Sequence, residues 1–123
     1  AHISVVSYNG SVLLVGQAPS ENLKNEAGKI ASQINGVVRV HNQVRIGKPV
    51  TLSTRTNDLL ITSKVKANLI AEKEIDGLNV KVTTEDSEVF LMGLLTHSEA
   101  AKATEVARNI NGVARVVKVF EYQ

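Results

Sequence analysis

Residues 34–40 read Ile-Asn-Gly-Val-Val-Arg-Val, and residues 110–116 repeat them as Ile-Asn-Gly-Val-Ala-Arg-Val. In both stretches Asn-Gly ends an amphipathic segment and apolar residues follow, which is typical of a helix that stops at a left-handed glycine before a strand. Upstream, residues 10–16 (Gly-Ser-Val-Leu-Leu-Val-Gly) correspond to residues 87–93 (Ser-Glu-Val-Phe-Leu-Met-Gly). Because two separate blocks recur in the same order, the chain contains two copies of one small unit.

Each copy is predicted to fold as a β-hairpin, a helix and a last strand. Apolar and polar residues alternate on both sides of the acidic turn at residues 85–87, and Asn9-Gly10 is the matching turn in the first copy. Ser20 and Ser98 can each act as a helix N-cap, and the Asn-Gly pairs are stop signals. The predicted bounds are helices from about Ser20 to residues 35–36 and from about Ser98 to residues 111–112, and last strands over residues 37–46 and 113–122.

The second copy has a further helix in front of its hairpin, at about residues 57–72. Ile61, Val65 and Leu69 recur there at i, i+4 and i+8, so they are expected to form its buried stripe. The first copy begins directly with its first strand, so we expect its first helix to be missing and its sheet face to be exposed. An exposed apolar face would favour a homodimer through the first copy. The helices after the hairpins are expected to face the sheets through Leu23, Ala27, Ile30 and Ile34 in the first copy and Ala103, Val106, Ala107 and Ile110 in the second.

The composition argues against several classes of function. Hydrophobic residues make up 43% of the chain and charged residues 21%, so the chain is expected to fold. Aromatic residues are only 3%, and the net charge of +2 is not gathered in a polybasic tract, so no nucleic-acid partner is expected. The sequence has no cysteine and no apolar run of about 18 residues, so neither thiolate chemistry nor a transmembrane helix is expected.

The sequence contains no recognisable catalytic or metal-binding pattern. His2, His41 and His97 are isolated from one another and from any His-Glu-x-x-His spacing. The acidic residues at 72–76 and 85–88 lack EF-hand spacing and are expected to be solvated charges. Gly-x-Ser-x-Gly, phosphate-loop and dinucleotide motifs are also missing from the sequence. We therefore predict no enzyme activity, no cofactor and no metal.

The predicted elements follow the order helix, hairpin, helix, strand. The second strand is apolar and ends in Gly, and the residues Ile-Asn-Gly-Val-x-Arg-Val lead into the last strand. This arrangement resembles the BON domain. The resemblance covers essentially the whole chain and is most specific, at residues 57–65, 79–85 and 88–94, for outer-membrane lipoproteins with two BON domains. It implies an α+β fold of two tandem BON domains in αββαβ order, each a three-stranded mixed sheet with two helices on one face, the first without its N-terminal helix. We place the domains at residues 1–46 and 57–123, with a linker at residues 47–56.

The resemblance also implies a function. Such proteins are non-enzymatic, bind anionic phospholipid, support outer-membrane integrity and concentrate at the cell division site. They lie in the periplasm, held to the inner leaflet of the outer membrane by a lipidated cysteine, which this chain does not contain. Lipid binding in the family is associated with the first helix of the second BON domain, which corresponds here to the segment around Leu59, Leu60, Ser63, Lys64, Ala67 and Ile70.

The amphipathic pattern of this helix supports the same site. Leu59, Leu60 and Ile70 are rotated away from the buried stripe at about 100° per residue. They could enter the acyl boundary of a membrane while Lys64, Lys66 and Lys73 meet lipid phosphates. The alternative is that these apolar residues pack against the other domain or the linker.

A second apolar surplus is predicted on the far face of the second sheet. Phe90, Met92, Val117 and Val119 should lie together there, whereas the corresponding last-strand positions of the first copy are polar. This face is expected to be an interface between the domains. The alternative is a docking site for envelope partner proteins, which would make the chain a protein-interaction adaptor.

Gly16 and Gly93 end the second strands of the two copies. A tight turn or a close backbone approach explains both glycines. The alternative is a direct role of Gly93 in lipid binding.

Overall fold

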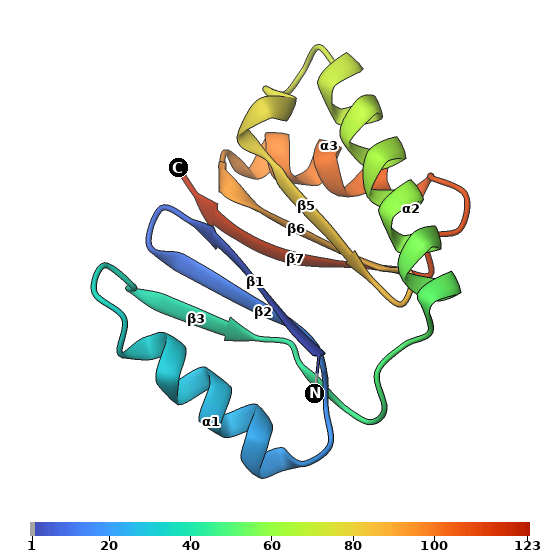
Figure 1. Ribbon diagram of the computed structural model, residues 1–123. Helices are drawn as coiled ribbons and strands as arrows, with labels where there is room; N and C mark the ends of the chain where they lie inside the picture. Colours follow the sequence, from blue (N-terminus) through green and yellow to red (C-terminus); the bar gives the residue numbers. More distant parts are fainter. Residues whose placement is uncertain (1) are drawn as a thin grey trace. The chain divides into compact units, whose positions relative to one another are not determined.

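The computed structural model describes residues 2–123 and shows two compact units, Ala1–Val50 and Thr51–Gln123 (Figure 1). Each unit has a sheet of its own. Along the chain, a hairpin is followed by a helix and then by a strand that pairs in parallel with the second strand of the hairpin. The α+β fold that the family resemblance implied is therefore confirmed.

The first unit consists of a hairpin, one helix and a last strand in two pieces. β1 (His2–Tyr8) pairs in antiparallel fashion with β2 (Ser11–Ala18). α1 (Glu21–Ser32) then returns the chain so that β3 (Arg39–Asn42) and β4 (Arg45–Ile46) both pair with β2 in parallel. β2 is thus the central strand, and all eight of its residues are buried.

The break between β3 and β4 differs from the continuous strand predicted over residues 37–46. The Asn42 side chain explains it, because Oδ1 accepts a hydrogen bond from the Val44 N–H at 3.3 Å and Nδ2 donates to the Lys24 carbonyl at 2.9 Å. A local side-chain turn of this kind competes with ladder pairing. It directs Val44 into the core, where this residue is buried.

The second unit has the complete order helix, hairpin, helix, strand. β6 is the central strand, with β5 antiparallel on one side and β7 parallel on the other. Both helices contribute to one core with the sheet (Figure 1). The elements are α2 (Leu52–Ala71), the 3-10 turn η1 (Gly77–Asn79), β5 (Lys81–Glu85), β6 (Glu88–Leu95), α3 (His97–Arg108) and β7 (Arg115–Tyr122).

The start of α2 differs from the prediction. The helix begins at Leu52, five residues before the predicted start at Asn57. Thr51 is the reason, because its Oγ1 accepts a hydrogen bond from the Thr54 N–H at 3.2 Å and so satisfies a free amide of the first turn. Residues 52–56 of the expected linker are therefore helical.

The start of α3 also differs from the prediction, which had Ser98 as the N-cap. Thr96 caps this helix instead: its Oγ1 accepts from the Glu99 N–H at 3.1 Å, and the Glu99 carboxylate accepts from the Thr96 N–H at 3.0 Å. This reciprocal pair is a capping box, which satisfies two amides at once and outcompetes a single serine. Ser20 is the N-cap of α1, as predicted.

The core of the second unit contains the stripe predicted for its first helix. Ile61, Val65 and Leu69 of α2 are buried against the apolar face of the sheet. Ala103 and Ala107 of α3 are buried in the same core, with Val106 and Ile110 partly buried against it. The predicted sheet-facing residues of this unit are thus confirmed.

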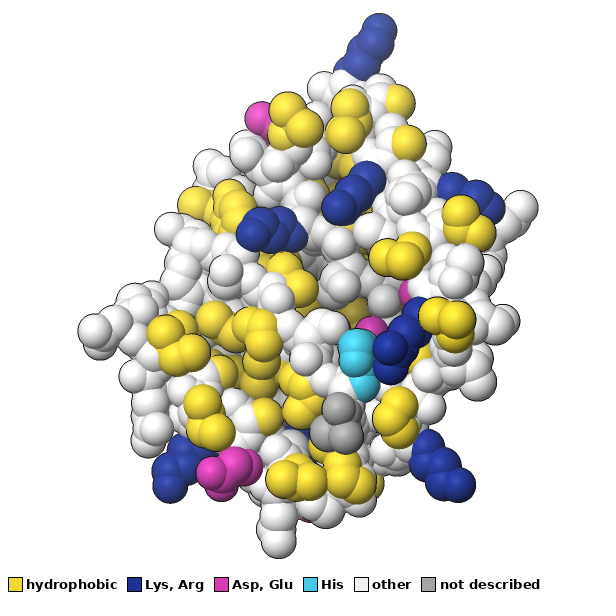
Figure 2. Space-filling view, viewed as in Figure 1, with side chains coloured by type: hydrophobic (Ala, Val, Ile, Leu, Met, Phe, Trp, Pro, Cys, Tyr) yellow, Lys and Arg dark blue, Asp and Glu magenta, His cyan; other side chains and the backbone are white. Residues whose placement is uncertain are grey.

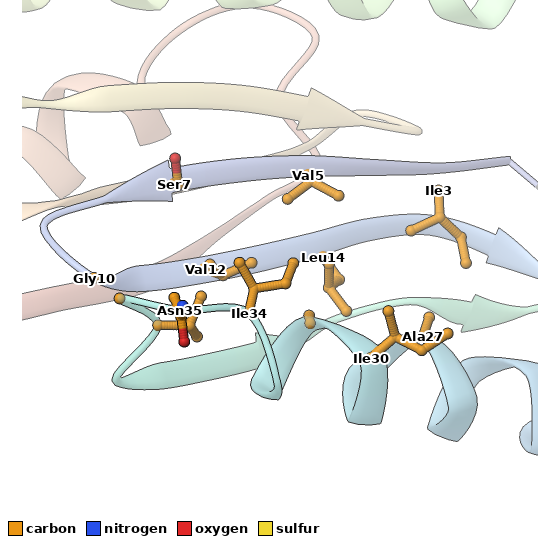
Figure 3. A pocket seen from close by; sticks show the side chains of 13 residues that line it. Ile3, Val5, Ser7, Gly10, Val12, Leu14, Ala27, Ile30, Ile34 and Asn35 are labelled. Atoms are coloured by element: carbon orange, nitrogen blue, oxygen red, sulfur yellow. The ribbon is translucent and has the colours of Figure 1, made fainter.

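The helix stripe predicted for the first unit is not buried in this way. Leu23, Ile30 and Ile34 are about half exposed, and Ala31 is the buried residue of α1. Ile30 and Ile34 do turn toward the sheet, where they line an open groove of about 700 Å³ with Ile3, Val5 and other apolar residues (Figure 3). The prediction that these residues face the sheet is therefore confirmed for Ala27, Ile30 and Ile34, but not for Leu23, and the groove that they line is open.

The corresponding groove of the second unit is filled by α2. Through the repeat, Val5 corresponds to Val82, and these residues are 64% and 7% exposed. A Cβ added at Gly112 would lie 3.4 Å from Ile61 Cδ1 of α2, whereas one added at Gly36 would meet nothing within 4 Å. The expected exposure of the first sheet face is thus confirmed, and a homodimer through it stays a prediction.

Candidate functional site

α2 carries a second apolar face that points away from the core of its unit. Leu59, Leu60 and Ile70 are 70%, 56% and 58% exposed, and Leu52, outside the predicted helix, is 79% exposed. Ser63 and Ala67 are exposed between them. We call this surface the α2 ridge; it consists of Leu52, Leu59, Leu60, Ser63, Ala67 and Ile70.

The ridge lies opposite the buried stripe because of the helical repeat. At about 100° per residue, Leu59 and Ile70 point about 160° and 180° away from Ile61. An amphipathic helix of a globular protein normally has one apolar face, directed to the core. α2 has two, and the exposed one has no role in the core of the second unit.

The exposed charges on α2 are positive. Lys64 and Lys66 are exposed on opposite flanks of the ridge, while Arg55 is half-buried and Asp58 is buried. Hydrophobic and basic side chains are interspersed over α2 (Figure 2). The outward face of this helix therefore combines apolar side chains with cations, which suits an anionic surface with an apolar interior.

Two polar contacts fix the rotation of α2 about its axis. The Asp58 carboxylate accepts hydrogen bonds from the Asp86 and Ser87 N–H groups at 2.8 and 2.9 Å. One turn later, Thr62 Oγ1 donates to Thr84 Oγ1 of β5 at 2.8 Å. Because both contacts are on the side of the sheet, they keep the ridge on the outside. The sequence did not predict either contact.

The second predicted surface is assembled on β6 and β7. Phe90 lies opposite Val117 and Met92 opposite Val119 in the parallel register. Phe90, Met92 and Val119 are buried and Val117 is partly buried, but none of them belongs to the core that the two helices cover. The structure thus brings the four residues together on the face opposite the helices. Their role as an interface stays a prediction.

Gly93 lies in the central strand β6 and not on the α2 ridge. It has a positive φ of 158°, and a Cβ added there would lie only 2.5 Å from the Asn79 carbonyl oxygen. Gly16 has a φ of 128° and also lies against backbone atoms, those of His2 and Ile3. A close backbone approach therefore accounts for both glycines.

The described residues contain no arrangement that indicates catalysis. Among residues 2–123, no cluster of three His, Cys, Asp or Glu side chains could hold a metal ion. His97 stacks on Tyr122 with 4.0 Å between the ring centroids. Within the same range, no helix is both long and apolar enough to cross a bilayer.

Comparison with known protein families matches the BON domain over residues 1–48 and 57–123, so the chain belongs to the BON domain family. It is 43% identical over 122 residues to the "21 kDa hemolysin" of Actinobacillus pleuropneumoniae, covering 99% of this chain and 63% of that protein. It is 37% identical over 120 residues to "Outer membrane lipoprotein DolP" of Haemophilus influenzae, covering 98% of this chain and 62% of that protein. The "Osmotically-inducible protein Y" of Escherichia coli is 32% identical over 117 residues, covering 93% and 58%. The chain thus spans less than two thirds of the length of these relatives.

Proposed function

We propose that this chain is a non-enzymatic, peripheral membrane-binding module of the bacterial envelope that binds anionic phospholipid through the α2 ridge. The observation that carries the proposal is the second, exposed apolar face of α2, flanked by Lys64 and Lys66. A relative named as an outer membrane lipoprotein supports a place at the outer membrane. The proposal includes a location at the inner leaflet of the outer membrane, which faces the periplasm. It also includes a role in envelope integrity and enrichment at the division site.

The expected affinity of the ridge for a membrane is modest. Complete transfer of a leucine side chain from water is worth about 1.5–3 kcal/mol, and each lysine near an anionic surface adds about 1 kcal/mol. Partial insertion yields only a fraction of the first figure, and association itself has an entropic cost. The ridge therefore suits reversible contact with a surface, as one of the two signals that stable anchoring needs.

The proposal is tested with vesicles of phosphatidylglycerol and, as the zwitterionic control, phosphatidylcholine. We expect co-sedimentation with the anionic vesicles at low salt and NMR shifts concentrated on α2. Leu59→Ser combined with Leu60→Ser should weaken binding at least about tenfold, because two apolar contacts are removed. Val38→Ser, at a residue that is 83% exposed in the first unit, is the matched control and should bind like the wild type. Folded wild-type protein that ignores anionic vesicles would refute the proposal.

A protein-interaction adaptor is the second candidate function. It would use the apolar group Phe90, Met92, Val117 and Val119, which lies on the sheet face opposite the helices and in which Val117 is the partly exposed member. Val117→Lys changes the most accessible position of this group. Loss of a defined envelope partner with unchanged vesicle binding would support the adaptor function.

A further inference from the structure

An open hollow of about 440 Å³ lies between α3 and β7 in the second unit. Two alanines of α3 line it together with six polar residues: His97, Thr104, Glu105 and Arg108 of α3, and Lys118 and Tyr122 of β7. We call this space the α3–β7 hollow. It is separate from the α2 ridge, because none of its lining residues belongs to α2.

Helical spacing brings the α3 residues of the hollow into one line. His97, Thr104 and Arg108 lie within about 40° of one another around the axis, at about 100° per residue. At the start of this line the His97 ring stacks on Tyr122, with 4.0 Å between the ring centroids. The stack joins the beginning of α3 to the end of β7, so the hollow runs between the two elements.

Lys118 interrupts the apolar pattern on the helix side of β7. Side chains alternate along a strand, so Lys118 projects on the same side of the sheet as Val116 and Phe120, which pack in the core. It also lies opposite the core residue Leu91 of β6 in the parallel register. Lys118 is nevertheless exposed, because it reaches the hollow and not the core.

The two cations of the hollow are available to an anion. No ion pair or hydrogen bond joins the Arg108 or Lys118 side chain to another of residues 2–123. Other cations nearby are paired: Lys102 lies 4.0 Å from a Glu72 oxygen, and Arg115 lies 3.3 Å from a Glu88 oxygen. Among the described residues that line the hollow, Glu105 is the one acid. Positive charge therefore predominates there.

The first unit provides an internal comparison, because the corresponding space is filled. Through the repeat, Lys118 corresponds to Asn42 and Thr104 to Gly28. Asn42 Nδ2 donates a hydrogen bond to the Lys24 carbonyl at 2.9 Å, and a Cβ added at Gly28 would lie 2.8 Å from the same nitrogen. The asparagine thus occupies the space against α1. An open hollow with a free lysine is a feature of the second unit alone.

We propose that the α3–β7 hollow binds a phosphate group, as the free ion or as the ester of a polyol, between Arg108 and Lys118. A guanidinium can donate two N–H groups to one phosphate, and an ammonium adds a further donor and a second positive charge. The Glu105 carboxylate beside them can accept a hydrogen bond from a hydroxyl of the polyol. Because both cations are exposed, the expected dissociation constant is on the order of 1 mM.

The binding test is an NMR titration of the full chain with glycerol 1-phosphate, with the ionic strength held constant by sodium chloride. We expect saturable amide shifts at residues 104–108 and 117–119 and none at the corresponding residues 28–32 and 41–43 of the first unit. Shifts spread over all cationic surfaces without saturation would overturn the proposal.

Substitutions separate this site from general charge attraction. Lys118→Gln and Arg108→Gln should each weaken binding at least about fivefold, because each removes a charged donor. Lys102→Gln is the matched control: it removes the same charge from α3, but outside the hollow, and should bind within twofold of the wild type. Glu105→Gln should strengthen binding of inorganic phosphate about twofold to fivefold, because it removes a like charge. Equal losses in the Lys102 and Lys118 variants would overturn the proposal.

Further titrations identify the source of the phosphate. Equal affinity for inorganic phosphate and glycerol 1-phosphate indicates the free ion, and tighter binding of the ester indicates a polyol phosphate. Weaker binding of phosphatidylglycerol vesicles by Lys118→Gln than by the wild type would indicate a lipid head group. The Leu59→Ser, Leu60→Ser variant should bind glycerol 1-phosphate like the wild type, because the α2 ridge is not part of the hollow. Folded protein that binds none of these phosphates in the hollow would refute the site, whatever the ridge binds.

Discussion

At the scale of single residues, Asp58 connects the candidate site to the fold. Its carboxylate is buried and accepts hydrogen bonds from the N–H groups of Asp86 and Ser87, two residues with positive φ of 49° and 65° in the β5–β6 turn. Left-handed backbone is costly for residues other than glycine unless the surroundings hold it. The Asp58 side chain therefore stabilises the turn, and the same two hydrogen bonds hold the side chain in place.

Replacement of Asp58 should be costly for stability. Asp58→Ala leaves two amides of a strained turn without their acceptor, so we expect the free energy of unfolding to fall by about 2–4 kcal/mol. Urea denaturation of the second unit, followed by its NMR amide signals, measures the change. Asp76→Ala is the control, because this exposed carboxylate caps only η1 and its loss should cost about 1 kcal/mol. Equal effects of the two substitutions would contradict the anchoring role of Asp58.

At the scale of elements, the two units differ in what covers equivalent strands. Val82 of β5 belongs to the core under α2, whereas Val5 of β1 borders the open groove. The two valines occupy the same place in the repeat, so the contrast isolates the effect of the covering helix. Packing of this helix, and not the character of the strand, decides whether the position is core or surface.

We therefore expect the same substitution to act differently at these two positions. Val82→Ala should lower the free energy of unfolding of the second unit by about 2 kcal/mol, because it opens a cavity among buried side chains. Val5→Ala should change the first unit by less than about 0.5 kcal/mol, as is usual for exposed positions. Denaturation of each variant measures the change in its free energy of unfolding. A large cost at Val5 would mean that its side chain is covered in solution, as a homodimer through the groove would require.

At the scale of the whole molecule, the two units have cores of unequal size. Thirteen buried residues form the core of the second unit, and five form that of the first. Buried apolar area supplies most of the stability of a small fold. Because the first unit buries fewer apolar residues, we expect it to open at a lower free energy than the second unit. We therefore expect the second unit, which carries the α2 ridge, to be the more rigid of the two.

Native-state hydrogen exchange tests this difference. Amides of β2 should exchange through openings of lower free energy than amides of β6, although both are central strands. Protection factors measured by NMR on the intact chain compare the two strands directly. A single common free energy for both would show instead that the chain opens as one cooperative body.

The sequence by itself determined the repeat, the hairpins with their turns, and the buried stripe Ile61, Val65 and Leu69, because turn chemistry and helical periodicity are local properties of the chain. It also indicated Leu59, Leu60 and Ile70 as the outward face. It missed Leu52, although Thr51 and the seven-residue spacing from Leu52 to Leu59 were usable signals.

Only the tertiary structure decided what touches these local elements. The hydrogen bonds of Asp58 to the distant turn, the backbone that approaches Gly93, and the exposure of Ile30 and Ile34 all depend on residues far away in the sequence. Related local patterns gave a covered stripe in one unit and an open groove in the other. A residue is buried only where other parts of the chain pack against it. A pattern of apolar residues therefore predicts which face of an element tends to be buried, but not whether another element covers that face.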